Sequence, residues 1–271
     1  MKIAFQGEPG AYSEQALFGY FGQVDTVPCE SFDLVFAAVS SGQCQQGLIP
    51  IENSLAGSIH QNYDLLLRHN LHIVGEYFLR VRHCLISLPG VEKSVIKKVI
   101  SHPQALGQCA AYLRQLDVKT EPVYDTAGSV KILKASGERT TAAIASKRAA
   151  EIYEMQILQE GIEDNMENYT RFLAISKDAV EPQVDAKTSI VFTLKNQPGA
   201  LFKALSVFAL RDIDLAKIES RPLAGTPWNY LFYIDFVGAI SDESVNRAIN
   251  HLGEYALMLR VLGSYPRSNM T

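Results

Sequence analysis

The sequence predicts an α/β fold for residues 1–178, followed by a smaller α+β domain. Three observations support this. Short apolar runs alternate with helical patterns up to about residue 178, a polar stretch containing a proline follows at 177–186, and the order of elements changes after it. Strands separated by helices of this length indicate parallel sheets with crossover helices. The length of 271 residues also suits two domains.

In the first region, strand and helix patterns pair in chain order. The first three pairs are residues 2–5 with 12–22, 24–29 with 31–42, and 47–51 with 58–70; the next three are 97–102 with 104–116, 119–124 with 127–137, and 141–146 with 147–154. The extended stretch 71–88 separates the two sets, and a last strand at 170–176 returns the chain. We therefore expect two lobes with a cleft between them, lobe one from about 1–79 and 170–178, and lobe two from about 80–169.

The remaining residues predict a different arrangement. After a linker at 179–186, the domain 187–271 contains strands at 187–194, 213–222, 229–239 and 257–266, with helices at 198–212 and 241–256. Proline and glycine begin the first of these helices. The order β-α-β-β-α-β is that of a ferredoxin-like domain.

Composition excludes several classes of protein. The hydrophobic content of 47% is ordinary for a globular chain, and a net charge of −4 shows no preference for nucleic acid. The apolar run in "MKIAFQGEPG" is too short for a signal peptide or a membrane helix. The four cysteines are widely spaced, and the six histidines show no metal spacing. We therefore expect a cytoplasmic protein that has reduced thiols, needs no metal or other cofactor, and binds neither nucleic acid nor membrane.

Polar turns follow four strands of the first region: "QGEPGAYS", "ENSLAGS", "SHPQALGQC" and "DTAGS". Ligands of parallel α/β sheets bind beyond the carboxyl ends of the strands, where helix N-termini suit carboxylates or phosphates. The four turns could line one cleft. Taken alone, each turn is better explained by helix capping than by ligand binding, although "ENS" offers more polar groups than one cap uses. Asp125 could simply be a cap that leaves Thr126 and Ser129 as the ligand contacts.

The stretch "ENYTRFLAIS" (167–176) poses a problem, because Asn168, Thr170 and Arg171 stand at the start of a strand that is otherwise apolar. Burying such groups without partners costs on the order of a few kcal/mol each. A structural partner, a ligand or water must meet them. Other chemistry has little support: no GxGxxG, Walker or GxSxG motif is present, and Cys109 falls in a helical pattern typical of a buried thiol.

Several of these stretches, in this order and spacing, resemble the monofunctional prephenate dehydratase family: "GEPGAYSEQA", "IPIENSLAGSI", "SHPQALGQC", "NYTRFLAIS" and "ESRPLAGTPWNYLFYID". The resemblance covers nearly the whole chain. It implies a catalytic region like a type II periplasmic binding protein, with the site between its lobes, followed by an ACT regulatory domain. It also implies conversion of prephenate to phenylpyruvate with loss of water and CO2, inhibited by phenylalanine.

The resemblance also implies roles for individual residues. Thr170 is expected to assist departure of the ring hydroxyl, chiefly by orienting and hydrogen-bonding it, because threonine is a weak acid. Asn53, Ser101 and Gln108 fall on the family's polar catalytic positions. Further substrate or neighbouring contacts are expected from Ser13, Glu52, Ser54, Thr126, Ser129, Arg171 and Phe172. Arg171 suits either a substrate carboxylate or a salt bridge across the hinge.

In the C-terminal domain, "NQPGALF" opens a helix whose N–H groups could hold an amino acid's carboxylate, although a plain loop explains it too. The resemblance favours phenylalanine as the effector. The expected contacts are Asn196, Pro198, Gly199, Ala200, Leu201, Glu219 and Ser220. Since ACT domains commonly pair, a homodimer or homotetramer is expected, and the effector should favour an inactive arrangement of the lobes.

Two alternatives remain open. Arogenate, the transaminated relative of prephenate, could be the substrate; the small side chain of Ala174 leaves room for its amino group but does not decide the question. The chain could also be a non-catalytic sensor of an amino acid or a small acid. The polar "TRF" and "ENS" elements disfavour a sensor, because a binder needs no hydroxyl beside a leaving group.

Overall fold

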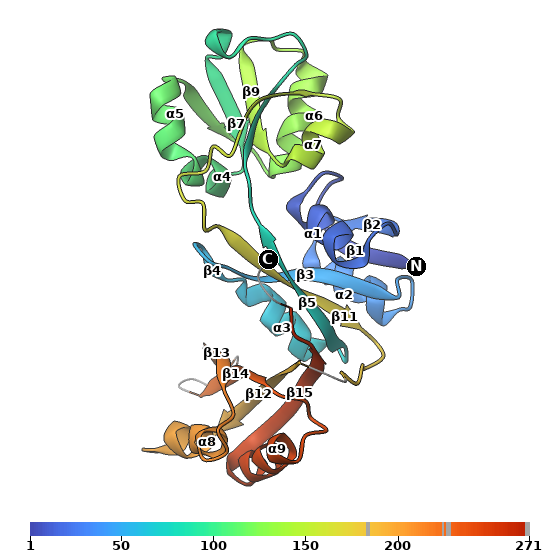
Figure 1. Ribbon diagram of the computed structural model, residues 1–271, viewed down its shortest axis with the longest axis vertical. Coiled ribbons are helices and arrows are strands. Elements are labelled where there is room, and N and C mark those ends of the chain that lie inside the picture. Colours follow the sequence, from blue (N-terminus) through green and yellow to red (C-terminus); the bar gives the residue numbers. More distant parts are fainter. Residues whose placement is uncertain (183–184, 224, 226–228, 269–271) are drawn as a thin grey trace. The chain divides into compact units, whose positions relative to one another are not determined.

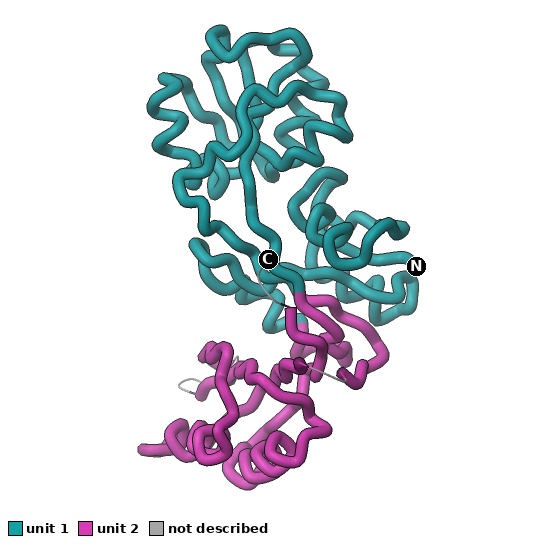
Figure 2. Tube along the Cα trace, in the orientation of Figure 1, with its two compact units in different colours: residues 1–65, 77–172 teal, residues 66–76, 173–271 magenta. Residues whose placement is uncertain are grey.

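A computed structural model describes residues 1–182, 185–223, 225 and 229–268 (Figure 1). The chain forms two compact units, residues 1–65 with 77–172, and residues 66–76 with 173–271 (Figure 2). Residues 66–76 thus belong with the C-terminal part, which differs from the predicted boundary at 179–186. Within that predicted linker, residues 183–184 lie outside the described part, as do 224 and 226–228 of the quoted stretch that ends "LFYID".

The first sheet has the strand order β2-β1-β3-β11-β5, with β4 paired to β3. Its strands are β1 (Lys2–Gln6), β2 (Asp25–Cys29), β3 (Gln46–Asn53), β4 (Gly57–Ser58), β5 (His72–Arg80) and β11 (Tyr169–Ser176), and its helices are α1 (Tyr12–Phe21), α2 (Phe32–Ser40) and α3 (His60–Arg68). β1 runs parallel to both β2 and β3. Ile3, Ala4 and Phe5 are fully buried, as expected of a central parallel strand covered on both faces.

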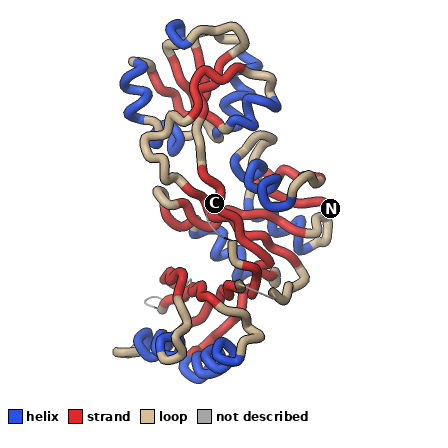
Figure 3. Tube along the Cα trace, in the orientation of Figure 1, coloured by secondary structure: helices blue, strands red, loops and turns tan. Residues whose placement is uncertain are grey.

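The second sheet has the order β10-β6-β9-β7-β8. It contains β6 (Cys84–Ser87), β7 (Lys98–Ser101), β8 (Lys119–Pro122), β9 (Thr141–Ala145) and β10 (Gln156–Glu160), with α4 (Pro103–Gln108), α5 (Ala110–Leu116), α6 (Thr126–Ser136), α7 (Lys147–Ile152) and the short 3-10 helix η1 (Lys93–Val95) (Figure 3). β7 is parallel to β8 and β9, whereas β6 is antiparallel to β9 and β10. The sheet is therefore mixed, and β10 is a strand that the sequence did not predict.

The predicted helix at 104–116 is interrupted. Cys109 has φ −116° and ψ 20°, so α4 ends there and α5 begins at the next residue. Both carboxylate oxygens of Asp164 accept hydrogen bonds from the backbone N–H of Ala111, at 3.1 and 3.0 Å. A carboxylate at this position satisfies a free N–H group of the first turn and favours a new helix start.

The C-terminal domain has the predicted β-α-β-β-α-β order: β12 (Ala186–Leu194), α8 (Ala200–Ala209), β13 (Leu215–Pro222), β14 (Tyr230–Val237), α9 (Glu243–Tyr255) and β15 (Ala256–Pro266). Its antiparallel sheet has the order β13-β14-β12-β15. Phe192, Phe208 and Phe236 are fully buried in its core. The fold class predicted from the sequence, an α/β region with a ferredoxin-like domain, is confirmed.

Residues 66–76 are joined to this domain by one buried ion pair and a set of partly buried hydrogen bonds. The ammonium of Lys187 on β12 lies 2.7 and 2.9 Å from the carboxylate oxygens of Glu76 on β5. Arg260 on β15 donates to the carbonyl of Leu67, in the last turn of α3, and to those of His69 and Leu71, which follow the helix. Both contacts lie within the second compact unit. They explain why this part of the chain clusters with the C-terminal domain.

Candidate active site

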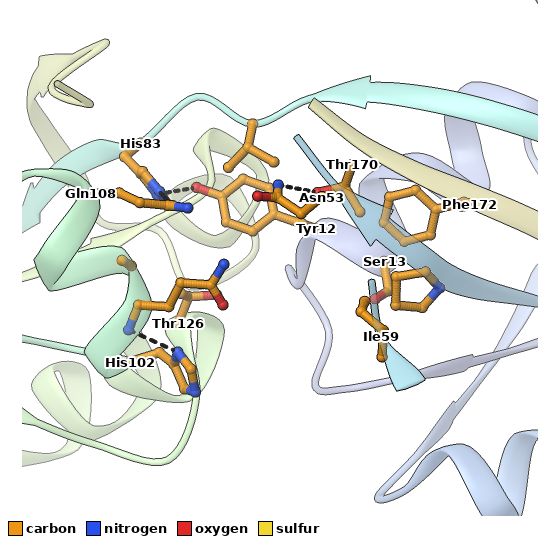
Figure 4. Close-up of a pocket in the computed structure, with 14 residues that line it drawn as sticks. Tyr12, Ser13, Asn53, Ile59, His83, His102, Gln108, Thr126, Thr170 and Phe172 are labelled. Atoms are coloured by element: carbon orange, nitrogen blue, oxygen red, sulfur yellow. Dashed lines mark hydrogen bonds between the residues drawn. The ribbon is translucent and has the colours of Figure 1, made fainter. Parts of the chain in front are cut away.

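The first compact unit contains a cavity of about 180 Å³ (Figure 4). Its polar lining consists of Tyr12, Ser13, Asn53, His83, His102, Gln104, Gln108, Thr126 and Thr170, and its apolar lining of Pro50, Ile59, Val81, Ala105 and Phe172. These residues come from strands β3 and β11, from the β4–α3 and β5–β6 connections, from the starts of α1 and α6, and from α4 with its N-cap. No Asp, Glu, Lys or Arg is among the lining residues.

Thr170 and Asn53 meet at the centre of one wall. The side-chain nitrogen of Asn53 shares its two hydrogens among three acceptors: Asn168 Oδ1 at 2.8 Å, Thr170 Oγ1 at 3.0 Å and the carbonyl of Tyr169 at 3.1 Å. The orientation of the Asn53 amide is fixed, because its oxygen accepts hydrogen bonds from the backbone N–H groups of Leu55 and Ala56 at 3.0 and 2.9 Å. Thr170 Oγ1 is therefore the acceptor, and its own hydrogen has no partner among the described residues. That hydrogen can be donated to a molecule in the cavity.

A second set of polar side chains continues from this pair. Gln108 Oε1 accepts from Asn168 Nδ2 at 3.1 Å and lies 2.9 Å from His83 Nε2. The hydroxyl of Tyr12 lies 2.7 Å from His83 Nδ1, with the two rings edge to face. Burial lowers the pKa of the His83 imidazole below its ordinary value. The cavity is thus bordered by a continuous, uncharged chain of hydrogen bonds.

The starts of two helices, α1 and α6, contribute to the cavity wall. The N-cap of α1, Ala11, provides no side-chain cap, and Tyr12 and Ser13 line the cavity. An adjoining cavity of about 340 Å³ is lined by these residues and by Thr126, the first residue of α6. Free N–H groups and the helix dipole at such ends favour anions without a basic side chain. The arrangement therefore suits carboxylates.

Three serines predicted in the site bond backbone groups instead. Ser101 is fully buried and donates to the carbonyl of Ile144 at 2.6 Å, across the β7–β9 pair. Ser129 is fully buried and donates to the carbonyl of Thr126 at 2.6 Å. The Ser54 hydroxyl donates to the carbonyl of Glu167 at 2.8 Å. None of the three lines the cavity, because each hydroxyl finds a backbone partner beside it.

Arg171 and Glu52 are also placed outside the cavity. Side chains alternate between the two faces of a strand, so Arg171 points away from the face that presents Thr170 and Phe172. Its guanidinium lies 3.5 Å from the Glu52 carboxylate, and its side chain is 5% exposed. The salt bridge joins the neighbouring strands β3 and β11 of the first sheet and does not cross a hinge as expected, while the predicted substrate contact of Arg171 has no support in the cavity lining.

A smaller cavity, of about 110 Å³, lies in the C-terminal domain. Asn196, Ala200 and Leu201 line it, as predicted for an effector site. Pro198, Gly199, Glu219 and Ser220 are not among its lining residues, and their contact with an effector stays a prediction. The remaining lining residues are Leu194, Lys195, Gln197, Asn229, Tyr230 and Phe232. None of these six is among the predicted contacts. The last three are remote in sequence from the start of α8, and β14 joins this wall through its pairing with β12.

Other reactive groups are engaged or buried. Burial raises the pKa of the Cys109 thiol far above its ordinary value and that of Cys84 to about 11, so neither is poised as a nucleophile. His102 Nδ1 accepts from the N–H of Gln104 at 3.2 Å and caps α4.

Within the described ranges, no group of three or more His, Cys, Asp or Glu could hold a metal ion. No described helix is both long and apolar enough to cross a membrane.

Comparison with protein families finds two domains. Residues 3–180 match the prephenate dehydratase model, and residues 188–254 match the ACT domain model. An arogenate dehydratase/prephenate dehydratase of Arabidopsis thaliana is 49% identical over 98% of this chain and 73% of its own length. Arogenate dehydratase 2 of Petunia hybrida is 47% identical over 98% of this chain and 72% of its own.

Solved structures also match this chain over nearly its whole length. A prephenate dehydratase from Arthrobacter aurescens, in complex with L-Phe, has a TM-score of 0.91 and 31% identity, covering 98% of this chain and 90% of that one. A protein described as a novel type of quorum-quenching acylase, GqqA, has a TM-score of 0.93 and 34% identity, covering 99% and 98%. The overall fold is therefore that of solved prephenate dehydratases.

One expectation from the sequence is contradicted by these relatives. Several of the curated proteins, among them two arogenate dehydratase/prephenate dehydratases of Arabidopsis thaliana, are chloroplastic, which conflicts with the predicted cytoplasmic location. The prediction was based on the residues at the N-terminus and the widely spaced cysteines, and neither feature identifies a compartment.

The extent of the match, over nearly the whole length and both domains, establishes the family. The chain belongs to the prephenate dehydratase family and carries a C-terminal ACT domain.

Proposed function

We propose that this dehydratase converts prephenate to phenylpyruvate, with loss of water and CO2, in the 180 Å³ cavity. One observation carries the proposal: Thr170 accepts a hydrogen bond from Asn53, and this leaves the hydroxyl hydrogen available to a ligand. Prephenate is a cyclohexadienol with two carboxylates. Its ring hydroxyl must leave as the ring becomes aromatic.

The reaction needs no strong acid at this position. As the ring carbon–carboxylate bond breaks, its electron pair completes the aromatic ring and CO2 leaves, while the carbon–oxygen bond to the hydroxyl breaks. Thr170 would donate its hydrogen bond to the departing oxygen, which gains a proton from water. Asn53 holds the threonine oxygen in place. Positioning and preorganised hydrogen bonds supply the acceleration.

The two substrate carboxylates would be held by backbone N–H groups. The starts of α1 and α6 line the two adjoining cavities, and Ser13 and Thr126 add hydroxyls there. The walls contributed by Phe172 and Ile59 suit the ring. A carboxylate held by N–H dipoles rather than by a fixed cation is free to leave as neutral CO2 without separating an ion pair.

Arogenate is the second candidate substrate, and the names of the relatives favour it. Its ammonium needs an acceptor, yet no acidic side chain is among the residues lining the 180 Å³ cavity. In the adjoining cavity, the Asp125 carboxylate already accepts from the N–H of Gly128. Ala174 is fully buried and is not among the lining residues, so it gives no support to either substrate. We therefore propose prephenate as the better substrate.

The experiment is a comparison of kcat/KM for the two substrates, with phenylpyruvate followed by ultraviolet absorbance and phenylalanine by chromatography. We expect kcat/KM for prephenate to exceed that for arogenate by about tenfold or more, the cost of leaving one ammonium poorly paired. A higher kcat/KM for arogenate would reverse the assignment. Turnover of neither substrate would favour a non-catalytic sensor.

The similarity to an acylase gives a third possibility a specific test. Acyl transfer requires a nucleophile that is activated by a base. The described partner of Thr170 Oγ1 is the amide donor of Asn53. The geometry therefore favours a hydrogen bond to a leaving group over nucleophilic attack. Hydrolysis of an acyl amide by the purified protein, lost in Thr170→Ala, would contradict this assignment.

We further propose that phenylalanine binds the 110 Å³ cavity of the ACT domain and lowers turnover, and that the chain pairs through this domain. The presence of L-Phe in the related structure supports an amino acid effector. The backbone at the start of α8, beside Asn196, suits its carboxylate, and Leu201 suits its ring.

Filling this cavity should abolish feedback. Ala200→Trp places an indole in the space that the effector would use, so we expect the ratio of rates with and without 1 mM phenylalanine to approach one. Calorimetry should show heat of binding for the parent protein and none for the variant. Inhibition that survives in Ala200→Trp would place the effector elsewhere.

A further inference from the structure

Two lining residues that the reaction above does not use, His83 and Tyr12, complete the hydrogen-bonded chain along the cavity wall. The hydrogen-bond donors and acceptors in that chain can be assigned from one end. Because backbone N–H groups fix the Asn53 oxygen, Asn53 Nδ2 must be the donor to Asn168 Oδ1. Asn168 Nδ2 must then be the donor to Gln108 Oε1.

This assignment fixes Gln108 as well. Its oxygen accepts from Asn168, so the neighbouring His83 Nε2, at 2.9 Å, can bond to it only as a donor. Gln108 Nε2, with two hydrogens, then has no partner among the described residues. Since Gln108 lines the cavity beside His83, those hydrogens are available to a bound substrate (Figure 4).

The tautomer of His83 follows from the same assignment. With Nε2 protonated and the ring neutral, Nδ1 is an acceptor, and the Tyr12 hydroxyl at 2.7 Å is its donor. Tyr12 also lies 3.0 Å from the carbonyl of Arg82, but its single hydrogen can serve only one acceptor strongly. Burial is the largest influence on the His83 pKa and lowers it, while Gln108 and Glu163 act in the opposite direction. The neutral ring leaves the Tyr12 hydrogen directed at His83.

We infer that His83 and Tyr12 are positioning residues: Tyr12 holds His83 in its Nε2–H tautomer, and His83 holds the oxygen of Gln108 so that the amide N–H groups face the substrate. This inference rests on the proposed dehydratase reaction. Gln108 then offers the cavity a second oriented hydrogen-bond donor besides Thr170, joined to it through Asn168 and Asn53. Such preorganised donors stabilise charge that develops on departing oxygens or carboxylates.

Substitutions at His83 test the inference. Glutamine can place its amide nitrogen where His83 Nε2 lies, whereas asparagine places it near Nδ1, too far from Gln108. We expect His83→Leu and His83→Asn to lower kcat by about 10- to 100-fold, and His83→Gln to remain within about threefold of the parent. Tyr12→Phe should show a smaller loss, since it removes only the group that sets the tautomer.

A double-mutant cycle separates positioning from general damage to the fold. If His83 acts through Gln108, adding His83→Leu to Gln108→Ala should lower kcat little further. Losses that multiply would overturn the inference, as would full activity in His83→Leu. Thermal unfolding of each variant checks that the protein folds.

A third measurement does not depend on activity. Nitrogen NMR of the histidine-labelled protein should show His83 protonated at Nε2 and unprotonated at Nδ1, with this preference weakened in Tyr12→Phe. The opposite tautomer would overturn the inference even in an active enzyme. Failure of the parent protein to process either substrate would instead refute the proposed function, and the NMR result would still decide the orientation of His83.

Discussion

Thr170→Ala is expected to lower kcat by about 100- to 1000-fold while changing KM little, because it removes a hydrogen bond that matters chiefly as the hydroxyl departs. The cavity keeps its other lining residues, so binding of the substrate should persist. Steady-state kinetics with phenylpyruvate detection gives both constants.

Thr170→Ser is the matched control. Serine keeps the hydroxyl that Asn53 holds, so we expect it to retain most of kcat, with some loss from the freer rotation of its side chain. A Thr170→Ala enzyme with near-parental kcat would show that the hydroxyl has no part in the reaction. Equal losses in the alanine and serine variants would indicate a requirement for the β-branched shape instead.

The second large effect concerns stability. Lys187 and Glu76 form an ion pair whose side chains are 7% and 0% exposed, and Glu76 also accepts from the backbone N–H of Ser268 at 3.1 Å. Lys187→Met would leave the Glu76 carboxylate buried without its ammonium partner. Removing one member of a buried pair typically costs about 3–5 kcal/mol of unfolding free energy. We expect a loss of this size in chemical denaturation of the second unit.

An exposed pair provides the control for this experiment. Lys134 lies 3.4 Å from Glu154, but their side chains are 47% and 85% exposed, so Lys134→Met should leave stability unchanged within error. The double variant Glu76→Leu, Lys187→Met removes both buried charges and should recover much of the loss. Equal stability of Lys187→Met and Lys134→Met would show that the buried pair contributes little.

The candidate site was predictable where its residues follow a strand directly. Thr170, Asn53 and Gln108 line the cavity together with Ser13, Thr126 and Phe172. The pattern of polar turns and the strand "TRFLAIS" indicated the stretches, and the family resemblance indicated the individual catalytic residues among them. The rule that ligands bind beyond the carboxyl ends of parallel strands places such turns at one edge of a sheet. The turns themselves can be recognised from the local sequence pattern. Their catalytic and binding roles remain proposals.

The same rule could not separate a ligand contact from a structural bond. Ser101 follows the pattern as well as Asn53 does, yet its hydroxyl reaches the carbonyl of Ile144, 43 residues away. Conversely, Tyr12 and His83 are 71 residues apart and meet at 2.7 Å, although nothing in their own surroundings marks them as partners. A hydroxyl or an imidazole bonds whichever group the packed chain brings within reach, and that choice is made over long separations in sequence.

The sequence by itself determined the order of most elements, the ferredoxin-like domain and the set of polar turns, because these depend on the periodicity of apolar residues and on local capping chemistry. Only the tertiary structure decided which polar groups face the cavity and which face the protein. It also decided that residues 66–76 belong with the C-terminal unit, through the pairing of Glu76 with Lys187. Hydrogen bonds and ion pairs depend on distances of a few ångströms, and such distances between remote residues exist only once the chain has packed.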